Sequence, residues 1–325
     1  MRIVVALGGN ALLRRGERAG IDEQRANVRR AAAQLATVAA GNDLVIVHGN
    51  GPQVGLLASQ SAQSGGAERF PLDVLDAETE GMIGYLIELE LRNYLASARA
   101  STTMLTMVEV DPLDPAFTHP DKPIGTGMTL AETKTATREA GWTTARDGAL
   151  YRRVVASPLP VRMLEANAVR WLLQHGSVVI CAGGGGIPVV ADAHRGYRGV
   201  EAVIDKDRTA AMLAREIEAD LFVIATDVRG VYLDWGKASA RPIRSAGPDA
   251  LIGLGFAAGS MGPKVEAACE FATRTRRRAV IGALDDIARM VAGDAGTSIE
   301  AGQHGVVEGT PDVAELSAVA KEKAS

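Results

Sequence analysis

Short apolar runs alternate with helix-length segments along most of this chain, and this alternation constrains its fold more than any other feature. The runs are rich in β-branched residues and lead into glycine, aspartate or other loop residues: 2–9, 43–51, 101–110, 177–186, 220–228 and 278–284. Strands buried on both faces of a sheet have this composition. The helix-length segments are 21–40, 81–96, 162–176, 208–219 and 263–275. The pattern predicts an α/β fold with an open, mostly parallel sheet covered by helices on both faces.

Three of the expected strands lead directly into glycine-rich turns, at Gly8-Gly9-Asn10, at Gly49-Asn50-Gly51 and at Gly183–Gly186. Ligands of open α/β sheets bind at the carboxyl ends of the strands, where these turns lie. Consecutive glycines between two apolar runs are costly in backbone entropy. We therefore expect something to approach the main chain closely at this edge of the sheet.

One stretch interrupts the alternation, with weak periodicity and several prolines and glycines. Residues 118–156 are interpreted as an inserted lid subdomain, with a helix over 130–141 and a hairpin over 142–155 that turns near Asp147-Gly148. We expect residues 1–300 to form one domain that includes this lid. Residues 301–325 are expected to form a C-terminal extension with a helix-prone end.

Composition excludes several classes of protein. The 325 residues carry a formal net charge of −4, which gives no reason to expect a nucleic-acid partner. No apolar run has the length of a membrane span, and the first residues lack the layout of a signal peptide. Cys181 and Cys269 stand far apart, outside any redox or metal-binding pattern. We expect a cytoplasmic protein with two ordinary buried thiols and no membrane partner.

Charged residues stand where a phosphate would need them. Asp205, Lys206 and Asp207 immediately precede an expected helix, and Lys264 lies in the first turn of another. The helix macrodipole disfavours a cation in the first turn, so Lys264 points to an anion bound nearby. Asp207 on its own is also consistent with a helix N-cap.

Familiar nucleotide signatures and metal patterns do not fit. Pro263 and Val265 flank Lys264 where a Walker A loop needs glycine and serine or threonine, and Pro188 replaces the last glycine of a dinucleotide fingerprint. The histidine spacing of a metal site is missing, so no protein-bound metal is expected. His48, at the end of a strand, is more typical of a packing residue than of a catalytic base.

Nine motifs in order give the chain a family resemblance: ALGGNAL, HGNGPQVG, EGMIGY, DKPIG, SPLP, AGGGGIPV, GVEAVIDKD, TDVRGVYLDWGK and GSMGPKVEAA. Together they resemble the carbamate kinases of the amino-acid-kinase superfamily over nearly the whole chain. The resemblance implies a three-layer αβα sandwich around a sheet of about eight strands, a protruding lid and a homodimer. It also implies reversible phosphoryl transfer between ATP and carbamate, or from carbamoyl phosphate to ADP, with Mg²⁺.

The resemblance assigns roles to residues of this sequence. Lys122, Lys206 and Lys264 are expected to carry charge to the phosphates, with Asp205 holding the lysines in position. The transferred group and the carbamoyl group are expected at Gly8, Gly9, Asn10, Gly49, Asn50, Gly51, Gly184 and Gly185, where glycine clears a path for phosphate. The nucleotide is expected at Thr226, Asp227, Tyr232, Ser260, Met261 and Gly262.

Some alternatives stay open. Asn50 either donates its amide to the acceptor beside Lys122 or only tolerates a left-handed turn. The sequence departs from the family pattern at TGMT after KPIG, at Ala156 and at Glu80, which leaves room for another small carboxylate or carbamate-like acceptor. A non-catalytic nucleotide-binding regulator is a further alternative, although Lys122, Asp205, Lys206 and Lys264 are all present.

Overall fold

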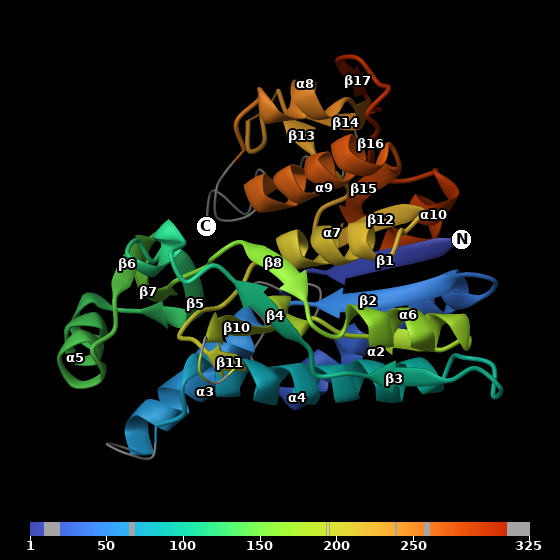
Figure 1. Ribbon diagram of the computed structural model, residues 1–325. Helices are drawn as coiled ribbons and strands as arrows, with labels where there is room; N and C mark the ends of the chain where they lie inside the picture. Colours follow the sequence, from blue (N-terminus) through green and yellow to red (C-terminus); the bar gives the residue numbers. More distant parts are fainter. Residues whose placement is uncertain are drawn as a thin grey trace.

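The computed structural model describes residues 1–9, 20–64, 69–192, 194, 196–237, 239–256 and 261–310. A large central sheet dominates it (Figure 1). Its strands, in spatial order, are β13 (Tyr232–Leu233), β14 (Arg241–Ala246), β16 (Thr297–Ile299), β15 (Arg278–Ala283), β12 (Leu221–Thr226), β1 (Arg2–Leu7), β2 (Asp43–His48), β9 (Val178–Ile180) and β3 (Ser101–Thr103). The described sheet has ten strands, because β17 (Val306–Glu308) also pairs with β14. The strands from β15 to β3 run parallel, as predicted.

Helices cover both faces of this sheet and make it the middle of three layers. Alternate residues of β1 point to opposite sides: Val4 and Ala6 pack into one core, and Ile3 and Val5 into the other. The first core is closed by α6 (Ala166–Gln174), α7 (Lys206–Glu216) and α9 (Met261–Thr275). The second is closed by α2 (Ile21–Ala39), α4 (Leu72–Arg92) and α10 (Ile287–Ala292). The αβα sandwich expected from the alternation is confirmed.

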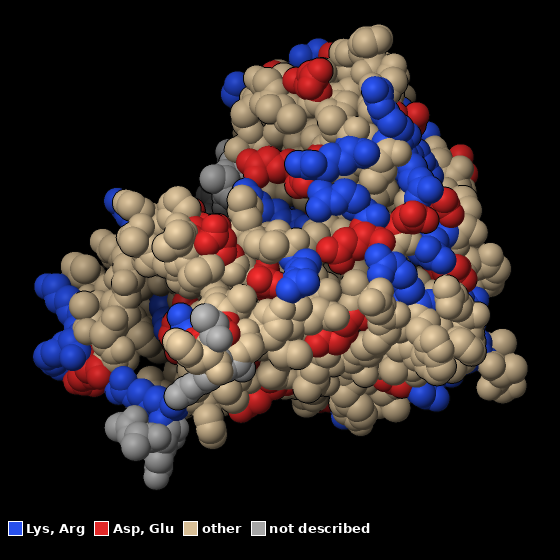
Figure 2. Space-filling view, viewed as in Figure 1, with Lys and Arg blue, Asp and Glu red and all other residues tan. Residues whose placement is uncertain are grey.

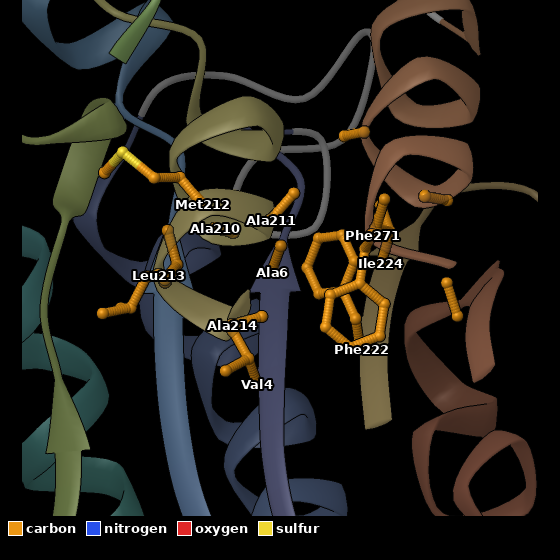
Figure 3. Packing of buried hydrophobic residues seen from close by; sticks show 14 of the residues in the cluster. Val4, Ala6, Ala210, Ala211, Met212, Leu213, Ala214, Phe222, Ile224 and Phe271 are labelled. Carbon is orange, nitrogen blue, oxygen red and sulfur yellow. The ribbon is translucent and has the colours of Figure 1, made fainter. Parts of the chain in front are cut away.

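Figure 3 shows part of the first core. α7 packs against β1, and its small side chains, among them Ala210, Ala211 and Ala214, let the helix approach the sheet. Phe222 of β12 and Phe271 of α9 meet with ring centroids 5.6 Å apart in a tilted arrangement. This is the favourable geometry for an aromatic pair. The packing fixes the N-termini of α7 and α9 relative to the strand ends.

The apolar run 101–110, expected as one strand, is two strands in different sheets. β3 ends at Thr103, and β4 (Met107–Val110) joins a second sheet with β8 (Pro160–Met163), β10 (Ile187–Asp192) and β11 (Gly196–Gly199). The backbone N–H and the hydroxyl of Thr106 both donate to Glu80 of α4, at 3.1 and 2.6 Å. These bonds take the chain away from β9, because Thr106 then no longer pairs with a neighbouring strand of the central sheet.

The lid is a separate small unit that projects from the body (Figure 1, green). It consists of β5 (Lys122–Met128), α5 (Leu130–Ala140), β6 (Thr144–Asp147) and β7 (Leu150–Val155). The predicted helix is confirmed: Thr129 and Glu132 form a reciprocal capping box, and Gly141 ends the helix with φ +69°. The predicted hairpin is also confirmed by the antiparallel pairing of β6 with β7.

Close backbone packing seats the lid root on α3 (Gly51–Ser64). A Cβ on Gly55 would lie 2.0 Å from the Cα of Gly125, so only glycine permits this approach. Ile124 and Val155 of the lid pack beside Val54 in a small core of their own. Farther from this root, a cavity of about 310 Å³ lies between the lid and the body, and Trp142 of the lid lines it. The lid is therefore packed against α3 at its root, whereas its outer part is separated from the body by the cavity.

Several helices and strands of the body were not predicted from the sequence. The periodicity gave no prediction for α3, α8 (Pro248–Ile252) or the strands β13, β14, β16 and β17. The boundary expected at residue 300 falls between β16 and β17, which both pair with β14. The expected C-terminal helix lies outside the described residues, and no helix in the described ranges has the length and apolarity to cross a bilayer. Figure 2 shows acidic and basic side chains interspersed over the face that it displays.

Candidate active site

The carboxyl ends of the central parallel strands bring the predicted turns together. Gly8 follows β1 and its N–H donates to Ala225 O of β12 at 2.8 Å. Gly49 follows β2 and its N–H donates to Leu7 O at 3.1 Å. A Cβ on Gly49 would lie 3.3 Å from the Cδ of Lys206, so the lysine side chain passes over this turn. The glycine turns and the N-terminus of α7 thus form one continuous edge.

A cluster of lysines and aspartates lies at this edge. Lys122 Nζ of the lid contacts Asp205 Oδ2 at 3.0 Å. Lys264 Nζ contacts Asp207 Oδ2 at 3.0 Å, and Lys206 Nζ contacts Asp207 Oδ1. Three lysines against two carboxylates leave one net positive charge. Such a cluster is suited to binding an anion.

Burial and ion pairing together set the charge of these groups. Burial alone would raise the pKa of Asp205, but Lys122 and Lys206 outweigh it and lower the pKa. For Asp207 burial likewise acts upward, and Lys206 with Lys264 lowers the pKa. Burial would lower the pKa of Lys264, whereas Asp207 holds it above its usual range. The carboxylates and Lys264 are therefore charged at neutral pH.

The division of labour between the two aspartates differs from the expectation. Asp205 caps α7, because its Oδ1 accepts the N–H groups of Asp207 and Arg208 at 3.0 and 3.2 Å. Its other oxygen holds Lys122 alone by a hydrogen bond. Asp207 binds both Lys206 and Lys264 and is not the N-cap. Sequence reasoning missed this role, since the carboxylate and Lys264 lie 57 positions apart.

The glycines of the 183–186 turn are required by the protein's own packing. A Cβ on Gly183 would lie 2.4 Å from the His48 ring, and one on Gly184 2.2 Å from the Asn50 amide. At Gly185 it would lie 2.5 Å from Ile204 O, and at Gly186 2.4 Å from a methyl group of Val108. These four glycines make room for packed groups of the chain itself, and the path for phosphate expected from the sequence stays a prediction.

At the carboxyl ends of the strands, open space lies beside Gly9 and Gly51. A Cβ on Gly51 would meet no described atom within 4 Å, and one on Gly9 would meet only Pro52 at 3.8 Å, an ordinary contact. Gly51 is the first residue of α3, where free backbone N–H groups are available to an anion. Gly9 and Gly51 are thus the predicted glycines best placed to face a bound group.

Asn50 is buried and its amide is already engaged. Its Nδ2 donates to Asp76 Oδ1 at 2.8 Å and to Thr79 Oγ1 at 2.9 Å. The expected donation from Asn50 to an acceptor carboxylate is therefore wrong for this arrangement, because both amide hydrogens are used. The alternative explanation also fails, since Asn50 is not among the residues with positive φ.

Glu80 and His48 pack against the 183–186 turn. Glu80 Oε1 accepts the N–H of Gly183 at 2.9 Å, and Thr106 links the same carboxyl group to Ala182 N. Burial raises the pKa of Glu80 to about 7. Burial lowers the pKa of His48 to about 4, which keeps the ring neutral. His48 is enclosed on all sides, as expected for a packing residue.

The residues predicted for the nucleotide occupy the neighbouring strand ends. Thr226 ends β12, and its hydroxyl donates to Asp227 Oδ1 at 3.0 Å. Tyr232 of β13 packs against Trp235 with ring centroids 5.0 Å apart. Met261 and Gly262 are the first two residues of α9, and Lys264 follows in the same turn. Asn10 and Ser260 lie outside the described residues.

No dedicated metal site is present among the described residues, where no group of three or more His, Cys, Asp or Glu side chains is placed to hold an ion. Asp205 and Asp207, the carboxylates at the N-terminus of α7, are bound by lysines. Cys181 and Cys269 are buried free thiols. Burial raises the pKa of Cys269 to about 12 and raises that of Cys181 further. Neither thiol is suited to nucleophilic chemistry.

Known proteins identify the family. The model of the amino acid kinase family matches residues 1–283. A carbamate kinase from Haemophilus influenzae is 55% identical over 94% of this chain and 99% of its own length. One from Rhizobium meliloti is 51% identical over 92% of this chain and 93% of its own. The chain belongs to the carbamate kinase family.

Solved structures of carbamate kinases share the fold described above. Carbamate kinase from Giardia lamblia bound to AMP-PNP is 36% identical and superimposes with a TM-score of 0.83 over 92% of this chain and 98% of its own. UMP kinase from Bacillus anthracis is 16% identical with a TM-score of 0.51, a likeness of fold alone. Because the carbamate kinase match covers so much of the chain, it spans the lid as well as the body. The alternative of a non-catalytic regulator is not favoured.

Proposed function

We propose that this chain transfers a phosphoryl group between ATP and carbamate at the edge that carries Lys122, Lys206 and Lys264. The observation that supports the proposal most is the arrangement of these lysines around Asp205 and Asp207. A net positive cluster beside the N-termini of α7 and α9 suits a group that carries several negative charges.

Carbamate is already an anion, so the reaction needs no general base to generate a nucleophile. The transferred phosphoryl group instead needs alignment and neutralisation of its charge. Lys206 and Lys264, held by Asp207, meet this need from the body. Lys122 adds a third charge from the lid when Asp205 holds it in place. The neutral His48 ring is enclosed and takes no part in proton transfer.

The substrates would occupy opposite sides of the lysine cluster. Carbamate lies beside Gly9 and Gly51, where the glycines leave open space. The nucleotide lies over the ends of β12 and β13, near Thr226, Asp227 and Tyr232, with its terminal phosphate toward α9. Gly8, Gly49, Gly184 and Gly185 contribute by shaping the backbone of the edge.

Mg²⁺ would enter with the nucleotide. It binds phosphate oxygens and waters in preference to an all-protein cage, which fits a site whose carboxylates are engaged by lysines. When bound, it supplies further neutralisation of the phosphate charge. The residues of this chain orient the phosphates through Lys206 and Lys264.

A second copy of the chain is the proposed partner. Met82, Tyr85 and Leu89 of α4 are exposed by 40%, 56% and 39%, and their spacing places them on one face of the helix. Leu105 and Met107, also exposed, follow β3, which packs against α4. A homodimer through this apolar face would be tested by sedimentation, with Tyr85→Glu expected to give monomers. A cytoplasmic location is also proposed, because Cys181 and Cys269 are free buried thiols, as is usual in a reducing compartment.

The test is ATP formation by the purified protein from ADP, Mg²⁺ and a panel of acyl phosphates. Carbamoyl phosphate is expected to be the preferred phosphoryl donor. Lys206→Ala should abolish most of this activity, whereas Lys237→Ala, which removes an exposed lysine paired with Asp234, serves as the matched control. Preference for a different acyl phosphate, or no ATP from any of them, would overturn the proposal.

A further inference from the structure

The hydrogen bonds around Asn50 have a fixed direction. The Thr79 hydroxyl lies 2.9 Å from the backbone carbonyl oxygen of Asp76. A carbonyl oxygen only accepts, so the single hydrogen of this hydroxyl is donated there. Thr79 Oγ1 can then only accept from its other neighbour, which is Asn50 at 2.9 Å. The atom of Asn50 that faces Thr79 must be the amide nitrogen.

The Thr79 hydroxyl therefore fixes the orientation of the Asn50 amide. With Nδ2 facing Thr79, its second hydrogen goes to Asp76 Oδ1 at 2.8 Å. The reversed amide would place Oδ1 against the Thr79 oxygen, with no hydrogen between them. The one polar atom of Asn50 that remains is therefore Oδ1, an acceptor, and no described residue donates a hydrogen bond to it.

Asn50 lies at the acceptor side of the candidate site. It stands between Gly49, next to Lys206, and Gly51, the open first residue of α3. Its amide packs against the Cα of Gly184, which has no Cβ to displace it. A side chain only 2% exposed and held by two hydrogen bonds presents its remaining atom in a single direction. Rigid presentation of one acceptor suits recognition of a single donor.

We propose that Asn50 selects an acceptor substrate that carries an N–H group, by accepting a hydrogen bond from that group through Oδ1. This inference rests on the proposed function and deepens it. Carbamate and carbamoyl phosphate carry such an amino group, whereas acetate and acetyl phosphate carry a methyl group of similar size in its place. Thr79 and Asp76 are positioning residues, because they fix which end of the Asn50 amide remains free.

The experiment measures kcat/KM for ATP formation from carbamoyl phosphate and from acetyl phosphate, each with ADP and Mg²⁺. The readout is the ratio of the two values, since a merely structural defect lowers both together. In Asn50→Ala the ratio should fall about tenfold or more, the scale of one hydrogen bond to a substrate N–H. Most of the change should come from carbamoyl phosphate.

Two variants of Thr79 test the positioning argument independently. Thr79→Val removes the oxygen that fixes the amide but keeps the side-chain shape, so the ratio should fall here as well. Thr79→Ser retains the hydroxyl and should restore the ratio. Thermal unfolding identifies a variant that fails to fold; if Asn50→Ala does so, the Thr79 pair decides the question.

An unchanged ratio in folded, active Asn50→Ala or Thr79→Val overturns this inference and leaves the proposed function intact. A wild-type protein that forms no ATP from carbamoyl phosphate instead contradicts the proposed function. A higher ratio in Thr79→Val than in the wild type also counts against the inference, because a freed amide should discriminate less well.

Discussion

Two pairs of buried carboxyl groups lie close together at this edge and behave in opposite ways. Asp205 and Asp207 have lysine partners, and their pKa values are lowered despite burial. Asp76 and Glu80 have no lysine partner in hydrogen-bonding contact among the described residues, and burial raises the pKa of both, that of Glu80 to about 7. Burial alone therefore does not decide the charge of a carboxyl group; a bound cation does.

The two pairs of carboxyl groups have different roles in the site. The lysine-paired carboxylates hold Lys122, Lys206 and Lys264 in place, and Asp207 keeps the pKa of Lys264 above its usual range despite burial. The unpaired carboxyl groups bind backbone and amide groups, and their raised pKa limits the negative charge beside the phosphate site. If both were ionised, they would outweigh the net positive charge of the cluster. Asp205 and Asp207 thus act through their lysines, and Asp76 and Glu80 act through the backbone and amide groups that they position.

The largest expected effect concerns the body lysines. Lys264→Ala should lower turnover by about two to four decades, the scale of losing a preorganised charge in phosphoryl transfer. Steady-state ATP formation measures it. Arg274→Ala, in the last turn of the same helix, is the control, because Arg274 only pairs with exposed Glu270. Near-normal turnover in folded Lys264→Ala would remove this lysine from the reaction.

Next in size is the loss of Asp207. Its side chain is only 3% exposed and serves two lysines, so Asp207→Asn should lower the free energy of unfolding by about 3–5 kcal/mol. Asp205→Asn should lower the free energy of unfolding by only about 1 kcal/mol. The side chains of Asp205 and its partner Lys122 are each 21% exposed, and Asn at this position still caps the helix. Urea unfolding compares the two variants. Equal losses would contradict the distinction between them.

Glu80 provides a test through pH. Its folded pKa of about 7 lies above the ordinary glutamate value of 4.5, so the folded state binds more protons between these two pH values. Its stabilising contribution is present below pH 4.5 and is lost as the pH rises through 7. Glu80→Gln does not titrate, so its free energy of unfolding relative to the wild type should rise by about 3 kcal/mol over this range. His48 and Asp76 are present in both proteins, so the difference isolates the titration of Glu80 together with its interaction with these two neighbours. A difference independent of pH would show that Glu80 is not perturbed.

The smallest effect is expected at the lid. Its root is fixed by Gly55 and Gly125, while a cavity separates the outer lid from the body. Hydrogen exchange of residues 125–133 should slow by a few-fold when AMP-PNP and carbamate bind, because Lys122, already paired with Asp205, then also contacts the bound phosphate. Exchange in α9 should change little. Unchanged exchange in the lid at saturation would argue against closure.

The sequence predicted what depends on local pattern. The alternation of β-branched runs with helical spacing was enough for the three layers, and the unfavourable position of Lys264 in a first helical turn pointed to the site. Local pattern could not predict contacts between distant residues. Lys122 and Asp205 are 83 positions apart, and only the family resemblance suggested that Asp205 holds this lysine. Nothing in the sequence indicated that Asp207 pairs with Lys264, 57 positions away. The reason for each glycine of the 183–186 turn likewise depends on which residue of another element lies against it.

The most direct test of the account is a double-mutant cycle between Lys122→Ala and Asp205→Asn, measured as kcat/KM for ATP formation. Asn keeps the cap of α7, so Asp205→Asn removes little besides the ion pair with Lys122. If Asp205 acts through this lysine, the double variant should lose no more activity than the worse single variant. Losses in activation free energy that add to within about 0.5 kcal/mol would contradict the account, since independent sites behave in that way.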